Sequence, residues 1–208
     1  AGLGMVNIHI AKGDLESAEK KCAELIQKAP DVLEYQIKSA QILFYQGEFD
    51  QTDAKLHEIV DQLPMDNYSV NDILDVMAVL IGFRHNQEEF VDFAKVQLNI
   101  QQNKRTEALE KLEELFDTNE IYIADMCRYQ HAWLTFLQGD AELTKMHLSK
   151  IENETIFKEL AHIFQAEILD FIDNDFSNAI DSYLEFLELY PQSIYYDDVR
   201  LRLRELAS

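Results

Sequence analysis

Cys127 and His131 stand four residues apart in a helical pattern, a spacing that places a thiol and an imidazole on one face of a helix. A thiol beside an imidazole is the arrangement of a cysteine nucleophile and its general base. No third residue that would orient the imidazole is evident, and Cys127 follows Met126 in an apolar stretch. We therefore expect no catalysis here, and we interpret Cys127 and Cys22 as two buried thiols.

Other patterns for binding chemistry are incomplete. The segment 173–178 begins like a calcium loop, but Asn178 stands where that loop needs glycine and Leu184 where it needs glutamate. None of the six histidines belongs to a His-Glu-x-x-His pair, which would place two zinc ligands on one helical face. Neither a glycine-rich phosphate loop nor a Gly-x-Ser-x-Gly elbow is present. The sequence predicts no metal ion, no cofactor and no enzyme activity.

The composition of the 208-residue chain favours an all-α fold. Only six glycines and three prolines occur, which is too few for the many turns of an all-β protein. Long stretches are instead rich in Ala, Leu, Glu, Lys and Ile, residues that favour helix. No apolar run approaches the roughly 20 residues of a membrane-spanning helix, so we expect no direct membrane insertion.

The formal net charge is −21. An acidic surface repels the phosphates of nucleic acids and of anionic membranes, and we expect neither as a partner. Residues 159–199 contain ten Asp or Glu and no Lys or Arg, and three arginines then follow up to residue 204. Such a run is consistent with a solvated face, and also with an acidic edge that attracts a basic partner or a second copy of the chain.

Turn-forming residues recur along the chain at positions 13, 47, 103, 139 and 174, in steps of 34, 56, 36 and 35. Each is Gly or Asn, the types that end a helix in the left-handed conformation. An Asp follows three of them and can cap the next helix, and prolines 30, 64 and 191 follow three of the second helices. The long step leaves room for one extra helix at about residues 69–84.

Small residues flank these turns at nearly constant distances, which lets two antiparallel helices approach closely. They precede the turn by seven or eight residues at Ala40, Ala132 and Ala166, and follow it by five at Ala18, Ala108 and Ala179.

This recurrence of small, Gly-Asp/Glu-aromatic/Leu, Ala and Pro positions resembles the tetratricopeptide repeat family. The resemblance implies a right-handed α-α superhelix, a solenoid of antiparallel helix pairs with about 11 helices, forming a single domain over residues 1–208. The corresponding repeats lie at about 1–32, 33–66, 88–120, 121–154 and 155–191, the extra helix at 69–84 and a capping helix at 193–206.

The segment 190–197, which reads Tyr-Pro-x-Ser-x-Tyr-x-Asp, is similar to bacterial envelope proteins of this family. A bacterial source follows from that similarity, and both the cytoplasm and the periplasm stay open as compartments. The chain opens at residues 1–6 in what reads as the middle of a helix, so we expect a piece of a longer protein.

Aromatic and aliphatic side chains form stripes on the first helices of the last two repeats. In the family, first helices line a concave groove that binds peptides or proteins, so the stripes are candidates for partner binding. The candidate residues are Tyr129, Trp133, Phe136, Phe164, Ile168 and Phe171. Packing in the core between helix pairs is the alternative interpretation.

We therefore expect a non-catalytic scaffold or adaptor that binds a protein or peptide, basic or apolar in character. A cluster of cations facing the groove cannot be assembled, so recognition of an acidic C-terminal tail is disfavoured. Two alternatives stay open: a self-associating structural module, and a regulatory appendage of an enzyme that lies upstream in a longer protein.

Overall fold

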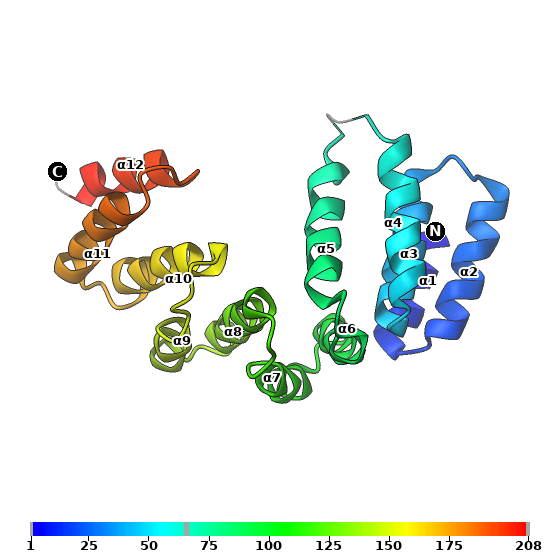
Figure 1. Cartoon of the computed structure of the whole chain (residues 1–208), viewed down its shortest axis with the longest axis horizontal. Coiled ribbons are helices and arrows are strands. Elements are labelled where there is room, and N and C mark those ends of the chain that lie inside the picture. The colour runs from blue at the N-terminus through cyan, green and yellow to red at the C-terminus, as the bar shows by residue number, and fades with distance from the viewer. Residues whose placement is uncertain (1, 65–66, 207–208) are drawn as a thin grey trace. The chain divides into compact units, whose positions relative to one another are not determined.

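A computed structural model of the chain describes residues 2–64 and 67–206 (Figure 1). Within these ranges the protein contains 12 α-helices, one π-helical turn and no strand, which confirms the all-α prediction. Helices that are adjacent in the sequence pack against each other in pairs. The chain divides into two compact units, residues 1–115 and 116–208, and each is described below by itself.

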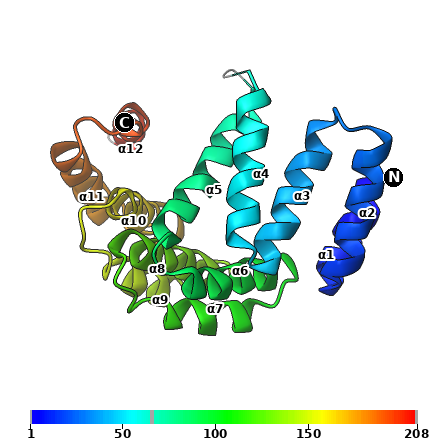
Figure 2. The same cartoon turned by 45° about the vertical axis from the view of Figure 1, so that its right-hand side comes forward.

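The first unit consists of three helix hairpins and one additional helix (Figure 2). Its helices are α1 (Gly2–Lys12), α2 (Leu15–Lys28), α3 (Leu33–Gln46), α4 (Phe49–Gln62), α5 (Ser69–Phe83), α6 (Gln87–Gln101) and α7 (Arg105–Glu114). The additional helix is α5, which contacts α4 and α6. Buried phenylalanines join α3, α5 and α6: the ring centroids of Phe44 and Phe90 are 5.1 Å apart, and those of Phe83 and Phe93 are 5.3 Å apart.

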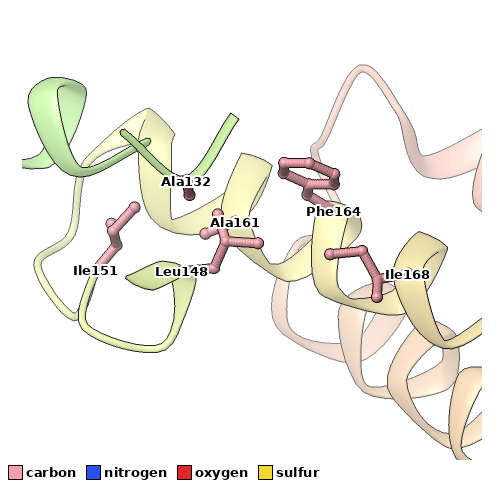
Figure 3. Close-up of a cluster of buried hydrophobic side chains, with 6 residues drawn as sticks. All are labelled: Ala132, Leu148, Ile151, Ala161, Phe164 and Ile168. Atoms are coloured by element: carbon pink, nitrogen blue, oxygen red, sulfur yellow. The ribbon is translucent and has the colours of Figure 1, made fainter. Parts of the chain in front are cut away.

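The second unit contains two helix pairs and a terminal helix. Its elements are α8 (Ile121–Phe136), α9 (Ala141–Leu148), α10 (Ile156–Glu167), the π-helical turn η1 (Ile168–Ile172), α11 (Phe176–Leu189) and α12 (Tyr196–Leu206). The terminal helix α12 packs on α11 (Figure 1). One core cluster joins α8, α9 and α10 through the buried side chains shown in Figure 3: Ala132, Leu148, Ile151, Ala161, Phe164 and Ile168.

The turns between paired helices have the backbone conformation that the sequence predicts. All five turn residues have positive φ, and they are the only described residues that do: Gly13 (77°), Gly47 (77°), Asn103 (59°), Gly139 (87°) and Asn174 (54°). Left-handed backbone favours Gly and, among the other residues, Asn. Five hairpins of common design therefore recur along the chain.

Aspartates cap three of the second helices, as expected. The carboxylates of Asp14, Asp140 and Asp175 accept hydrogen bonds from backbone N–H groups three residues later, at 3.1, 2.9 and 3.3 Å. Glu48 and Lys104 stand at the same place before α4 and α7 and make no such cap. Asp175 therefore has a structural role as the N-cap of α11, at the place where a calcium loop was considered.

The small residues lie where paired helices meet. Ala18, Ala108 and Ala179 are fully buried five residues after their turns, and threonines occupy this place in the other two hairpins. The hydroxyls of Thr52 and Thr144 donate to the carbonyls four residues earlier, both at 2.7 Å. A threonine thus fills a small buried site without leaving its hydroxyl unpaired.

The π-helical turn η1 accounts for a difference in spacing. Ala132 precedes its turn residue by seven positions, whereas Ala166 precedes Asn174 by eight. The backbone N–H of Asp173 donates to the carbonyl of Ile168, five residues earlier, at 2.9 Å. This wider turn absorbs the one extra residue.

The extra helix expected at 69–84 corresponds to α5 (Ser69–Phe83). Two other features differ from the expectation: the number of helices and the start of the last one. The described residues contain 12 α-helices, whereas about 11 were expected. Helix α12 begins at Tyr196, three residues after the expected start at 193. Ser193 accounts for this later start of α12: its hydroxyl accepts a hydrogen bond from Tyr195 N (3.0 Å) and its carbonyl accepts one from Tyr196 N (3.2 Å), which makes a turn before the helix.

None of the helices in the described ranges combines the length and the apolar composition that a membrane-spanning helix requires.

Candidate interaction surface

Aromatic side chains of α8 and α10 form a continuous series of ring contacts in the second unit. Phe157 contacts Tyr122 and Tyr129, with centroid separations of 5.2 and 5.9 Å. Phe164 lies 5.5 Å from Trp133, 5.1 Å from Phe136 and 6.2 Å from Tyr129. We name these six residues the aromatic face: Tyr122, Tyr129, Trp133, Phe136, Phe157 and Phe164.

The aromatic face is partly core and partly surface. Phe164 is only 6% exposed and packs in the cluster with Ala132 and Ala161, whereas Trp133 is 47% exposed and Tyr122 37%. Tyr129, Phe136 and Phe157 are half-buried against that cluster. Buried Phe164 thus supports an exposed indole, and the outer rings of the face are open to another molecule.

The structure gives the six candidate binding residues different surroundings. Four of them belong to the aromatic face, while Ile168 is 1% exposed and lies in the core cluster beside Phe164. Phe171 is 58% exposed, but the guanidinium of Arg202 lies 4.7 Å from its ring centroid. Ile168 therefore packs in the core beneath the aromatic face, whereas Phe171 contacts Arg202 of the terminal helix α12.

Two members of the aromatic face were missed by the sequence analysis. Tyr122 precedes Tyr129 by seven residues, and Phe157 precedes Phe164 by seven. Two helical turns separate residues seven apart, so they share a face. That spacing is the signal that could have found both residues.

A carboxylate borders the aromatic face. Glu167 follows Phe164 by three residues on α10, and water reaches its side chain. Neighbouring protein atoms nevertheless replace part of its hydration, which raises the pKa of the Glu167 carboxyl, and the charge of Asp170 raises that pKa further. Burial raises the pKa of the Tyr129 hydroxyl, and the charges of Glu167 and Tyr195 add to the shift. The face therefore has an acidic border close to Tyr129.

A buried carboxylate joins η1 to the last two helices. Asp170 is 1% exposed and accepts hydrogen bonds from Arg202 of α12 and from the Tyr183 hydroxyl of α11, the latter at 3.2 Å. The hydrogen bonds from Arg202 lower the pKa of the Asp170 carboxyl, although its burial acts in the opposite direction. Burial, and then the charge of Asp170, raise the pKa of Tyr183. With these partners in place, Asp170 is a structural anchor.

A second buried carboxylate fixes the connection that leads into α10. Asp125 of α8 is fully buried and accepts hydrogen bonds from Asn153 Nδ2 at 3.0 Å and from Thr155 Oγ1 at 2.9 Å. Arg128 lies 3.4 Å from the same carboxylate and donates to the carbonyl of Phe116 at 2.8 Å. The connection ends next to Phe157, so Asp125 helps to position one edge of the aromatic face.

The cysteine and histidine considered for nucleophilic chemistry lie inside the second unit. Cys127 and Cys22 are buried thiols that form no disulfide, as expected. His131 is 3% exposed, and its ring lies 4.1 Å from that of His147 and 5.5 Å from that of Phe116. Within residues 2–64 and 67–206, no three His, Cys, Asp or Glu side chains gather in a way that could hold a metal ion.

A hollow of about 460 Å³ lies between α10, α11 and the end of α9. Two of its polar side chains, His162 and Lys158, are already engaged with neighbouring residues. The His162 Nε2 atom lies 3.1 Å from the carbonyl of Ser182 and 4.0 Å from the Glu185 carboxylate, and Lys158 pairs with Glu154. The hollow is therefore a weaker candidate for binding than the aromatic face.

Comparison of the chain with protein-family models and with curated proteins found no match. The functional argument therefore depends on the geometry of the surfaces themselves. The aromatic face combines a series of six contacting rings with an indole that is 47% exposed.

Proposed function

We propose that the protein is a non-catalytic scaffold or adaptor module that binds a peptide or protein segment on the aromatic face. The observation that carries this proposal is the 47% exposure of Trp133 above the buried Phe164. Tryptophan and tyrosine anchor interfaces because their large, rigid rings lose little conformational entropy when they bind. Leaving the exposed rings of Trp133 and Tyr122 in water is costly unless a partner covers them.

The finer architecture is part of the same proposal. We propose that the helix pairs build a right-handed superhelix of the tetratricopeptide type, with α8 and α10 as first helices that line its concave side. The recurring left-handed turns and the fully buried small residues after them support this architecture. Stacked hairpins of this kind present extended concave surfaces to a partner.

A displayed library of random peptides tests the function. Peptides selected on the wild-type chain are expected to bind the variant Tyr129→Ala/Trp133→Ala at least about tenfold more weakly, a loss of about 1.4 kcal/mol or more. The matched control is Leu184→Ala/Leu189→Ala, which removes two exposed apolar side chains from α11 (53% and 56% exposed). The control should bind like the wild type.

Circular dichroism of each variant separates binding from folding. A Tyr129→Ala/Trp133→Ala protein that is folded but binds every selected peptide as tightly as the wild type would contradict the proposal. The single variant Trp133→Ala repeats the comparison with less disturbance of the core, since the indole is half exposed.

Self-association is the second candidate function. Exposed apolar side chains also lie on α11, at Phe176 (49%), Leu184 and Leu189, and Arg200 on α12 is exposed. A basic end could contact the acidic segment 159–199 of a second copy, which would be a head-to-tail contact. Light scattering over a wide concentration range tests this: a strict monomer at high concentration argues against it.

A further inference from the structure

Glu167 is an acidic group on the border of the aromatic face for which the structure shows no cation. It lies three residues beyond Phe164 on α10, close enough to Tyr129 for its charge to raise the pKa of that hydroxyl. No hydrogen bond or ion pair joins the Glu167 carboxylate to another group within residues 2–64 and 67–206. The Glu167 carboxylate is therefore available to accept a hydrogen bond from a donor on another molecule.

Three of the other nine carboxylates of the acidic segment 159–199 have a lysine or arginine partner. Asp170 pairs with Arg202 at 2.7 Å, Asp173 with Lys145 at 2.8 Å, and Asp197 lies 3.4 Å from Arg200. The segment itself contributes ten acidic side chains and no Lys or Arg. The negative charge of this segment is thus only partly compensated from within the chain.

We propose that the segment bound on the aromatic face is amphipathic and basic: its apolar side chains contact Trp133 and Tyr129, and a lysine or arginine beside them pairs with Glu167. This inference rests on the proposed function, because it names the chemistry of the partner for the same surface. The partner is a protein or peptide segment, since apolar anchors and a cation must be presented at the spacing of neighbouring side chains.

The energetics of Glu167 favour a basic partner over a neutral one. Neighbouring atoms already remove part of the hydration of this carboxylate, and a bound segment would remove more. Covering an unpaired charge is costly, whereas a donated hydrogen bond from a cation offsets the lost hydration. A neutral apolar segment should therefore bind less tightly, and an acidic segment should be repelled.

The experiment uses tryptophan-free random peptides displayed on phage and selected on the full chain. Trp133 is the only tryptophan, so its fluorescence reports directly whether a selected peptide covers the aromatic face. Selected peptides that shift the emission of Trp133 should carry Lys or Arg beside apolar residues. Replacing that cation with Gln should weaken binding by about five- to tenfold, and higher salt should weaken the parent peptide more than the Gln peptide.

Glu167→Gln on the chain should weaken the parent peptide by a similar factor and leave the Gln peptide unchanged. The matched control is Glu188→Gln, which removes the same charge from an exposed position on α11. It should change the affinity less than twofold. This pair of variants separates a local contact from the general effect of net charge.

Two outcomes overturn the inference, and they differ in what else they contradict. Selected peptides that cover Trp133 but carry no cation, and whose affinity Glu167→Gln leaves unchanged, would refute the basic partner and leave the proposed function standing. Selected peptides that never change the emission of Trp133 would refute the proposed function and the inference together.

Discussion

Arg202 of α12 donates two hydrogen bonds to Asp170 of η1, from Nε to Oδ2 at 2.7 Å and from Nη2 to Oδ1 at 2.8 Å, across 32 residues of sequence. Its guanidinium also lies over the ring of Phe171. The terminal helix is thereby fixed to the turn that follows α10. This contact holds the end of the second unit in a defined position, one element away from the aromatic face.

Removing the charge of Asp170 should destabilise the second unit. Asp170→Asn keeps the shape of the side chain but loses the ionic character of two hydrogen bonds, and we expect a loss of about 2 kcal/mol in the free energy of unfolding. Urea denaturation followed by circular dichroism measures it. The double variant Asp170→Leu/Arg202→Met should be less destabilised than Arg202→Met alone, because no buried carboxylate is left unpaired. Equal losses in these two variants would contradict this role of the pair.

The same pair predicts a dependence of stability on acid. The pKa of Asp170 is lower in the folded protein than in the unfolded chain, so the folded state holds the proton less tightly. The Asp170 carboxylate therefore contributes its full stabilisation of the folded state above the unfolded pKa of about 3.9, and this stabilisation is lost as pH falls through the lower folded pKa. Between pH 5 and 3 the wild type should lose more stability than Asp170→Asn. If the free energies of unfolding of the two proteins fell in parallel with pH, the stabilising role of the ionised Asp170 would be contradicted.

Substitution of the turn glycines should separate backbone strain from crowding. An alanine at Gly139 meets no atom within 4 Å, so only the positive φ opposes it, at a cost of about 1 kcal/mol. An alanine at Gly47 would also have to adopt a positive φ, and its Cβ would in addition lie 3.1 Å from Cγ2 of Val91. We expect Gly47→Ala to cost about 2 kcal/mol. Thermal unfolding of both variants tests the order, and a less stable Gly139→Ala would contradict it.

Much of the hairpin pattern could be predicted because it depends on local chemistry. Left-handed backbone at residues 13, 47, 103, 139 and 174 follows from the residue types at those turns, and the burial of Ala18, Ala108 and Ala179 follows from their constant distance to them. The contact between Asp170 and Arg202 could not be predicted in this way. It depends on a π-helical turn and on how α12 packs, and helical periodicity specifies neither.

Two rings of the aromatic face should differ strongly in their contribution to stability. Phe164 is 6% exposed within the core cluster, so Phe164→Ala should cost about 3–4 kcal/mol in the free energy of unfolding. Trp133 is 47% exposed, and Trp133→Ala should cost only about 1 kcal/mol. Circular dichroism in urea compares the two without relying on tryptophan. A loss of more than about 3 kcal/mol for Trp133→Ala would show that the indole belongs to the core.

Sequence periodicity identified four rings of the face but could not tell the exposed ones from the buried ones. Tyr129, Trp133 and Phe136 fit one helical stripe, and Phe164 and Ile168 fit another. Burial depends on which stripe lies between helix pairs, and that depends on contacts between α8 and α10. The sequence therefore supported both the core and the binding interpretation, and the structure shows that the face is partly each.

Accessibility of Trp133 to a neutral quencher is the most direct measurement of the binding surface. Acrylamide should quench the single indole readily in the free chain, because the side chain is half exposed. A peptide selected on the chain should then protect the indole and shift its emission to shorter wavelength, since bound apolar side chains replace water around it. An indole that is inaccessible in the free chain, or equally accessible with and without bound peptide, would contradict the proposal that partners dock on the aromatic face.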